Sequence, residues 1–114
     1  MLSRIFGRLR ETASASTIAH EELLKLHLEK GCTIVDVREP DEYARGYIPG
    51  AINQPLSRFD PAYVPHAGRT VLICQAGGRS AAALKRMSAT GRQDVQHYPA
   101  GMAGWRAARG PVET

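Results

Sequence analysis

Apolar and polar positions follow two different periods in alternate stretches of the chain. Some stretches are short and rich in β-branched residues, which is typical of buried strands. These strand-like stretches are residues 17–18, 34–37, 71–74 and 95–98. Other stretches are dominated by residues with high helix propensity. These helix-like stretches are residues 20–29, 80–90 and 103–109. The alternation predicts an α/β fold in which helices cover both faces of a parallel sheet.

The composition is that of one soluble globular domain. The chain has 114 residues, of which 43% are hydrophobic and 23% charged, and this length is enough to bury a single core. Its net charge of +4 is mild and fits a small anionic substrate. The sequence has no dense Lys/Arg run with interleaved aromatic residues, so we expect no nucleic-acid partner. We also expect no transmembrane segment, because every apolar stretch is too short to span a bilayer.

The first sixteen residues differ in composition from the rest. Arg4, Arg8 and Arg10 alternate with apolar residues, and Glu11 is the one acidic residue. This composition resembles a transit peptide or a short amphipathic helix on a membrane surface, whereas a loosely ordered extension is the simpler interpretation. We therefore divide the chain into a basic extension at residues 1–16, with a weak membrane-surface or partner contact as one role, and a domain at residues 17–114.

The two cysteines and four histidines do not form a metal-binding pattern. Cys32 and Cys74 lie far apart in the sequence, with neither a CxxC motif nor zinc-like spacing to a histidine. We therefore expect no metal and no cofactor. Two unrelated thiols are typical of the reducing cytoplasm, where we expect the protein to act unless residues 1–16 direct it to an organelle. The histidines, expected at the surface or on helices without a link to Cys74, are His20, His27, His66 and His97.

Residues 74–80, with the sequence CQAGGRS, combine a thiol with the features of an anion-binding loop. Cys74 ends the most apolar predicted strand, and ligands of parallel sheets bind beyond the carboxyl ends of the strands. Gly77 and Gly78 allow backbone N–H groups to converge on one point, and the following helix begins with unpaired N–H groups. A thiol at this point is expected to ionise. Cys74 is therefore the predicted nucleophile.

The other loop residues are predicted to contact the substrate or the thiolate. Gln75 and Ala76 contribute main-chain N–H groups. Arg79 adds a planar charged fork for a sulfonate or phosphate, and Ser80 caps the helix or donates to the thiolate. Four residues separate Cys74 from Arg79, one fewer than in tyrosine-phosphatase-type loops. The tighter ring suits a single transferred sulfur atom better than a phosphate dianion.

Three ordered motifs resemble those of the rhodanese family of sulfurtransferases. The first, IVDVREPDEYARGYIPGAINQP at residues 34–55, is similar to the upstream signature of the family, and the second is the loop at residues 74–80. The third is the closing stretch at residues 98–112, with Gly101, Met102, Trp105, Gly110 and Pro111. Over residues 17–114 the chain thus resembles a single-domain rhodanese. The resemblance implies a five-stranded parallel sheet flanked by helices.

The resemblance also implies a ping-pong sulfurtransferase. Cys74 would take a sulfane sulfur from thiosulfate or a persulfide donor, and a thiol or cyanide would then remove it from the Cys74 persulfide. In the family the residues that match Asp36 and Arg38 look chiefly structural, with the arginine pairing to a glutamate such as Glu42. We therefore assign these two at most a supporting part in the site. Two alternatives stay open. One is a rhodanese-fold module that acts through partner contacts, and the other is a cysteine-based phosphatase or arsenate reductase, which the short loop disfavours.

Overall fold

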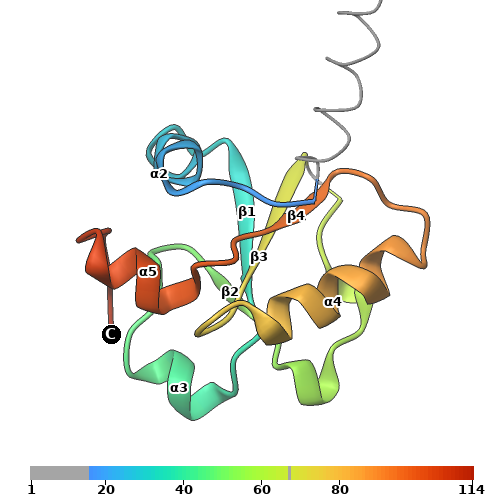
Figure 1. Ribbon diagram of the computed structural model, residues 1–114. Helices are drawn as coiled ribbons and strands as arrows, with labels where there is room; N and C mark the ends of the chain where they lie inside the picture. Colours follow the sequence, from blue (N-terminus) through green and yellow to red (C-terminus); the bar gives the residue numbers. More distant parts are fainter. Residues whose placement is uncertain (1–15, 67) are drawn as a thin grey trace, which may run out of the picture.

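The computed structural model describes residues 16–66 and 68–114, so the predicted extension lies almost wholly outside the described residues. Strands and helices alternate along the chain (Figure 1). The strands are β1 (Cys32–Asp36), β2 (Ile52–Asn53), β3 (Arg69–Ile73) and β4 (Val95–His97). The α-helices are α2 (His20–Leu28), α3 (Pro40–Ala44), α4 (Gly78–Ser88) and α5 (Gly101–Ala107). Two 3-10 helices, η1 (Leu56–Arg58) and η2 (Pro61–Tyr63), lie between β2 and β3.

The sheet is parallel throughout, with the strand order β2-β1-β3-β4. The predicted parallel sheet is confirmed, but the count of five strands is wrong for the described residues, which form four. The stretch predicted at residues 17–18 makes a single parallel bridge, from Thr17 to His97, beside β4. It does not extend into a strand because Ala19 is already the N-cap of α2.

Helices cover both faces of the sheet, as the sequence predicts. Successive residues of a strand point to opposite faces. The face of the sheet that includes Ile34 and Val71 packs on α2 and α5. The face that includes Val35 and Leu72 packs on α4. Cys74 continues this second pattern, so its side chain lies on the α4 face, beyond the carboxyl end of β3.

The starts of two helices differ from those predicted, and both differences shape the loop. α4 begins at Gly78, two residues before the predicted start, because Gly77 has a left-handed conformation and is its N-cap. α5 begins at Gly101 rather than at residue 103. In α2, Leu23 is fully buried whereas Leu28 is 67% exposed.

Two general features concern residues 16–66 and 68–114 only. No helix in these ranges combines the length and the hydropathy needed to cross a membrane. No group of three or more His, Cys, Asp or Glu side chains is placed there to hold a metal ion.

Candidate active site

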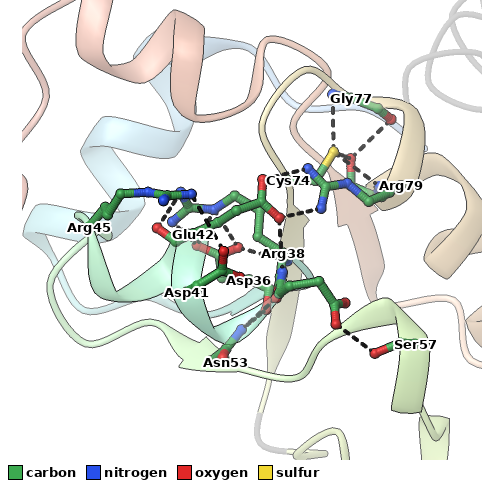
Figure 2. Close-up of polar contacts among 12 residues, drawn as sticks. Asp36, Arg38, Asp41, Glu42, Arg45, Asn53, Ser57, Cys74, Gly77 and Arg79 are labelled. Atoms are coloured by element: carbon green, nitrogen blue, oxygen red, sulfur yellow. Dashed lines mark hydrogen bonds and ion pairs between the residues drawn. The ribbon is translucent and has the colours of Figure 1, made fainter.

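The Cys74 sulfur lies among hydrogen-bond donors from the loop at residues 74–80 (Figure 2). The main-chain N–H groups of Gly77 and Ser80 donate to Cys74 Sγ at 3.1 and 3.3 Å. The Ser80 hydroxyl lies 3.6 Å from the same sulfur. Donors from one short turn thus converge on a single buried atom, which is the arrangement that an anion-binding loop requires.

The loop takes this shape because its first carbonyl groups are bound elsewhere. Cys74 O accepts a hydrogen bond from Met102 N at 2.8 Å, and Gln75 O accepts one from Ala103 N at 3.1 Å. Both donors belong to the first turn of α5, whose N–H groups have no partner inside the helix. With these carbonyl groups turned toward α5, the N–H groups of Ala76 and Gly77 face the sulfur.

Two glycines are required where the loop meets the chain that enters α5. Gly77 has φ +98°, and a Cβ there would lie 2.5 Å from Pro99 O. Gly101 has φ +63°, and a Cβ there would collide with Gln75 O. Gly78 differs from both, because a Cβ added to it would meet no heavy atom within 4 Å. Of the two glycines predicted to shape the loop, conformation therefore requires only Gly77.

Burial and hydrogen bonding act in opposite directions on the Cys74 thiol. The residue is 1% exposed, and this burial by itself raises the pKa of the thiol. Hydrogen bonds from the Ser80 hydroxyl and from the amides of Ser80, Ala76 and Gly77 outweigh burial and lower the pKa below its ordinary value. At neutral pH the Cys74 thiolate is therefore more populated than that of an ordinary cysteine.

The guanidinium of Arg79 is bound to the carboxylate of Glu42 in α3. The two Nη atoms donate to the two Oε atoms at 2.6 and 2.9 Å, and Figure 2 shows the Arg79 side chain beside the loop with its fork turned to Glu42. The hydrogen bond from Arg79 lowers the pKa of Glu42 to about 2. The fork predicted to face the substrate thus faces Glu42. The pair uses two of the five N–H groups of the guanidinium, and Arg79 remains 35% exposed.

Asp36 and Arg38 form a buried ion pair that fastens α3 to the sheet. Arg38 Nη2 lies 2.6 Å from Asp36 Oδ2, and the side chains are 3% and 0% exposed. Arg38 also donates to the carbonyl groups of Glu42 and Gly46 at 3.2 and 2.8 Å. The implied pairing of Arg38 with the Glu42 carboxylate is therefore wrong, because the fully buried carboxylate of Asp36 takes the guanidinium. Asp36 and Arg38 reach the loop only indirectly, by placing Glu42.

His97 corrects the expectation that no histidine is linked to Cys74. It lies in β4, is 9% exposed, and places Nδ1 at 2.9 Å from Ser80 Oγ. Burial lowers the pKa of this imidazole. The link was missed because the parallel register, which sets His97 beside Leu72 of β3, is not visible in the sequence. One signal was present, since alternation along β4 puts His97 on the same buried face as Val95.

Cys32 lies at the opposite end of the sheet from Cys74. In the sheet it is paired with Arg69, which lies five residues before Cys74 along the chain. The rise of a parallel strand over five residues is about 16 Å. Both cysteines are free thiols, and burial raises the pKa of Cys32. The two sulfur atoms cannot form a bond in the folded chain.

Known proteins are similar to this chain in sequence and in fold. The model of the rhodanese-like domain matches residues 20–108. The uncharacterized protein slr1261 of Synechocystis is 37% identical over 103 residues, which are 89% of this chain but only 58% of that protein. The thiosulfate sulfurtransferase GlpE of Pseudomonas putida is 32% identical over 101 residues, covering 85% of this chain and 89% of GlpE. A crystal structure of a rhodanese-related protein from Thermoplasma volcanium is 31% identical, with a TM-score of 0.77 over 86% of this chain and 97% of that one. The chain belongs to the rhodanese-like domain family.

Proposed function

We propose that this protein is a sulfurtransferase in which Cys74 carries the transferred sulfur as a persulfide. In the first half-reaction the Cys74 thiolate attacks the outer sulfur of thiosulfate, whose S–S bond breaks to release sulfite. In the second half-reaction a thiolate or cyanide attacks the outer sulfur of the persulfide, and Cys74 departs as a thiolate. One sulfur atom moves in each half-reaction, so neither an oxidant nor a reductant is needed.

The observation that carries the proposal is the set of main-chain donors at Cys74 Sγ, in a loop with four residues between Cys74 and Arg79. These N–H groups stabilise negative charge on Sγ when it attacks the outer sulfur of thiosulfate. They do so again when Sγ departs from the sulfur that the acceptor removes. Similarity to the thiosulfate sulfurtransferase of Pseudomonas putida along 89% of its length supports the same chemistry.

The rim of the loop supplies the proposed contacts to the donor. Gln75, Ala76 and Gly78 are exposed, whereas Gly77 is buried under the sulfur. The N–H groups of Arg79 that Glu42 does not use are available to the anionic end of a donor such as thiosulfate. The proposed donor is therefore small and anionic, and the proposed natural acceptor is a thiol. Because Cys74 must be reduced to react, a reducing compartment such as the cytoplasm is the proposed location.

The proposal is tested by the intact mass of the protein after incubation with thiosulfate. We expect a gain of one sulfur atom, which disappears on addition of cyanide as an equal amount of thiocyanate is released. Cys74→Ala should show neither change. Cys32→Ser is the matched control and should behave like the wild type, because Cys32 lies at the opposite end of the sheet, about 16 Å away along the strand direction. Sulfur uptake by Cys74→Ala, or its absence in the wild type, would overturn the proposal.

Assays with arsenate and with an aryl phosphate separate the remaining alternatives. Turnover of either compound that depends on Cys74 would identify an arsenate reductase or a phosphatase, and would contradict the inference from loop length. A wild-type protein that takes up no sulfur and turns over neither compound would instead act as a non-catalytic module of this fold.

A further inference from the structure

A chain of polar groups connects the Cys74 sulfur to strand β4 through Ser80. Ser80 Oγ lies 3.6 Å from Cys74 Sγ, 3.1 Å from Gly77 O and 2.9 Å from His97 Nδ1. All four residues are buried. A hydroxyl group has one proton, which it can give to only one of these three neighbours at a time. The neighbour that receives the proton decides whether the sulfur gains a donor beyond those of the main chain.

The position of the proton on the His97 ring controls that choice. If Nδ1 carries the proton, it donates to Ser80 Oγ, and the hydroxyl can turn its own proton to Gly77 O or to Cys74 Sγ. If Nδ1 is bare, it accepts the hydroxyl proton and competes with the sulfur. Within the described residues no buried side-chain nitrogen or oxygen lacks a partner. Within these residues the hydrogen bond of the His97 ring is made by Nδ1.

We infer that His97 is a positioning residue of the sulfur-transfer site, whose Nδ1–H group keeps the Ser80 hydroxyl free to donate to the Cys74 sulfur. In the thiol state the S–H group of Cys74 donates to Ser80 Oγ, and the hydroxyl donates to Gly77 O. When Cys74 loses its proton to water, the hydroxyl swings from Gly77 O to Sγ, while Nδ1–H continues to donate to Oγ. Gly77 O is not left without a partner, because it also accepts from Ala81 N at 3.0 Å.

The inference rests on the proposed function, because that function makes the Cys74 sulfur negative twice in each cycle. The sulfur is a thiolate when it attacks the donor and again when the acceptor removes the outer sulfur. Between these steps the negative charge lies on the outer sulfur of the persulfide, and the hydroxyl can return to Gly77 O. His97 therefore acts on the chemical steps and not on the binding of the donor.

Among residues 16–66 and 68–114, charged groups around His97 offer no other path to the sulfur. Arg79 of α4 is paired with Glu42 of α3, and no carboxylate of the described residues forms an ion pair with His97. Leu72, the neighbour of His97 in β3, is apolar. On the other side of β4, Thr17 meets His97 through a main-chain bridge. The link from His97 to the sulfur therefore runs through Ser80.

The test is the pKa of Cys74, measured from the ultraviolet absorbance of its thiolate with the same variant carrying Cys74→Ala as the blank. Absorbance suits a residue that is 1% exposed, because alkylation would be limited by access. In His97→Leu we expect the pKa to rise by about one unit, because Leu donates nothing to Ser80 Oγ and this buried oxygen then has a donor only while Cys74 keeps its proton. His97→Asn places an amide N–H where Nδ1–H was and should restore the pKa. His97→Gln places the amide N–H where Nε2 was and should not restore the pKa.

A double variant tests whether the effect passes through the hydroxyl. Ser80→Ala alone should raise the Cys74 pKa, and His97→Leu added to it should raise the pKa no further. An additive double variant would overturn the inference, and so would a folded His97→Leu protein with the wild-type pKa. If a thermal melt shows that His97→Leu does not fold, the Cys74 pKa values of His97→Asn and His97→Gln test the inference instead. Equal pKa values in these two variants would overturn it.

Kinetics provide a second readout that separates this inference from the proposed function. His97→Leu should lower kcat for the transfer from thiosulfate to cyanide about tenfold and leave the KM for thiosulfate unchanged. An increase in KM alone would contradict the assigned role. The pKa measurement uses no substrate, so a protein without sulfurtransferase activity would contradict the proposed function while the hydrogen-bond chain could still be confirmed or overturned.

Discussion

Replacing Glu42 by Gln removes the charge from the Arg79 ion pair and preserves the other contacts of the side chain. Glu42 Oε1 accepts a hydrogen bond from Glu39 N at 3.1 Å, as part of the capping box that begins α3. Gln has the same length and fills the same position in such a box. We therefore expect Glu42→Gln to lower the free energy of unfolding at pH 7 through the lost charge alone.

The pKa of Glu42 sets an upper bound on the loss. Mainly through the Arg79 hydrogen bond, the value falls from 4.5 to about 2, which is a change of about 2.5 units. At about 1.4 kcal/mol per unit the bound is about 3.4 kcal/mol. Because the Arg79 and Glu42 side chains are 35% and 26% exposed, water screens part of this interaction. We expect a loss of about 1–2 kcal/mol.

The loss should depend on pH in one direction. Since the pKa of Glu42 is lower in the folded chain, its contribution is complete above 4.5 and disappears as the pH falls toward about 2. Urea unfolding of the wild type and Glu42→Gln should therefore differ more at pH 7 than at pH 3. In an Arg79→Ala background the substitution should have little effect at either pH. A difference that is equal at both pH values would refute the reasoning, because it would show that the substitution acts through packing.

Three further predictions concern the loop itself. Gly77→Ala should abolish sulfur uptake and destabilise the fold by about 1–3 kcal/mol, because residue 77 has φ +98° and its Cβ would lie 2.5 Å from a backbone oxygen. Gly78→Ala should leave sulfur uptake and melting temperature unchanged, because a Cβ at residue 78 would meet no heavy atom within 4 Å. In steady-state assays Arg79→Ala should raise the KM for thiosulfate several-fold and Glu42→Gln should lower it, since the two substitutions change the charge at the rim in opposite directions. The single-turnover rate of sulfur uptake should rise with pH and level off at the Cys74 pKa, below the ordinary value of 9.0, and a midpoint above 9.0 would contradict the thiolate assignment.

The parallel sheet and its two layers of helices could be predicted because buried strands and helices leave clear apolar patterns. The elements that escaped prediction have little apolar pattern of their own. Strand β2 has only two residues, and Ile52 in it is 40% exposed. Helix α3 has no buried residue and is held instead by its capping box and by the hydrogen bond from Arg38 to Glu42 O. Such elements depend on contacts with distant parts of the chain, which a local pattern does not contain.

The candidate site divides in the same way between local and distant contacts. The main-chain donors to Cys74 Sγ, Gly77 and Ser80, come from one short turn, so their positions follow from the glycine at residue 77 and the helix after it. The partners of Arg79 and Ser80 come from α3 and β4, which lie far from the loop in the sequence. The carboxylate of Glu42 pairs with Arg79, because the guanidinium of Arg38 pairs with the fully buried carboxylate of Asp36. His97 was found only once the register of β4 against β3 was known.

The three motifs that define the family meet at one loop, and this explains why they occur together. The loop supplies Cys74 and the N–H groups that face it. The upstream motif supplies Glu42, which holds Arg79 beside the loop. The closing motif supplies Gly101 and the first turn of α5, whose N–H groups bind the carbonyl groups of Cys74 and Gln75. A side chain at Gly101 would push α5 away from Gln75 O, and the loop carbonyls would then be free to turn toward the sulfur. The lowered pKa of Cys74 therefore depends on a helix whose described hydrogen bonds go to the loop carbonyl groups and not to the sulfur, and a substitution in the closing motif should impair the nucleophile as surely as one in the loop.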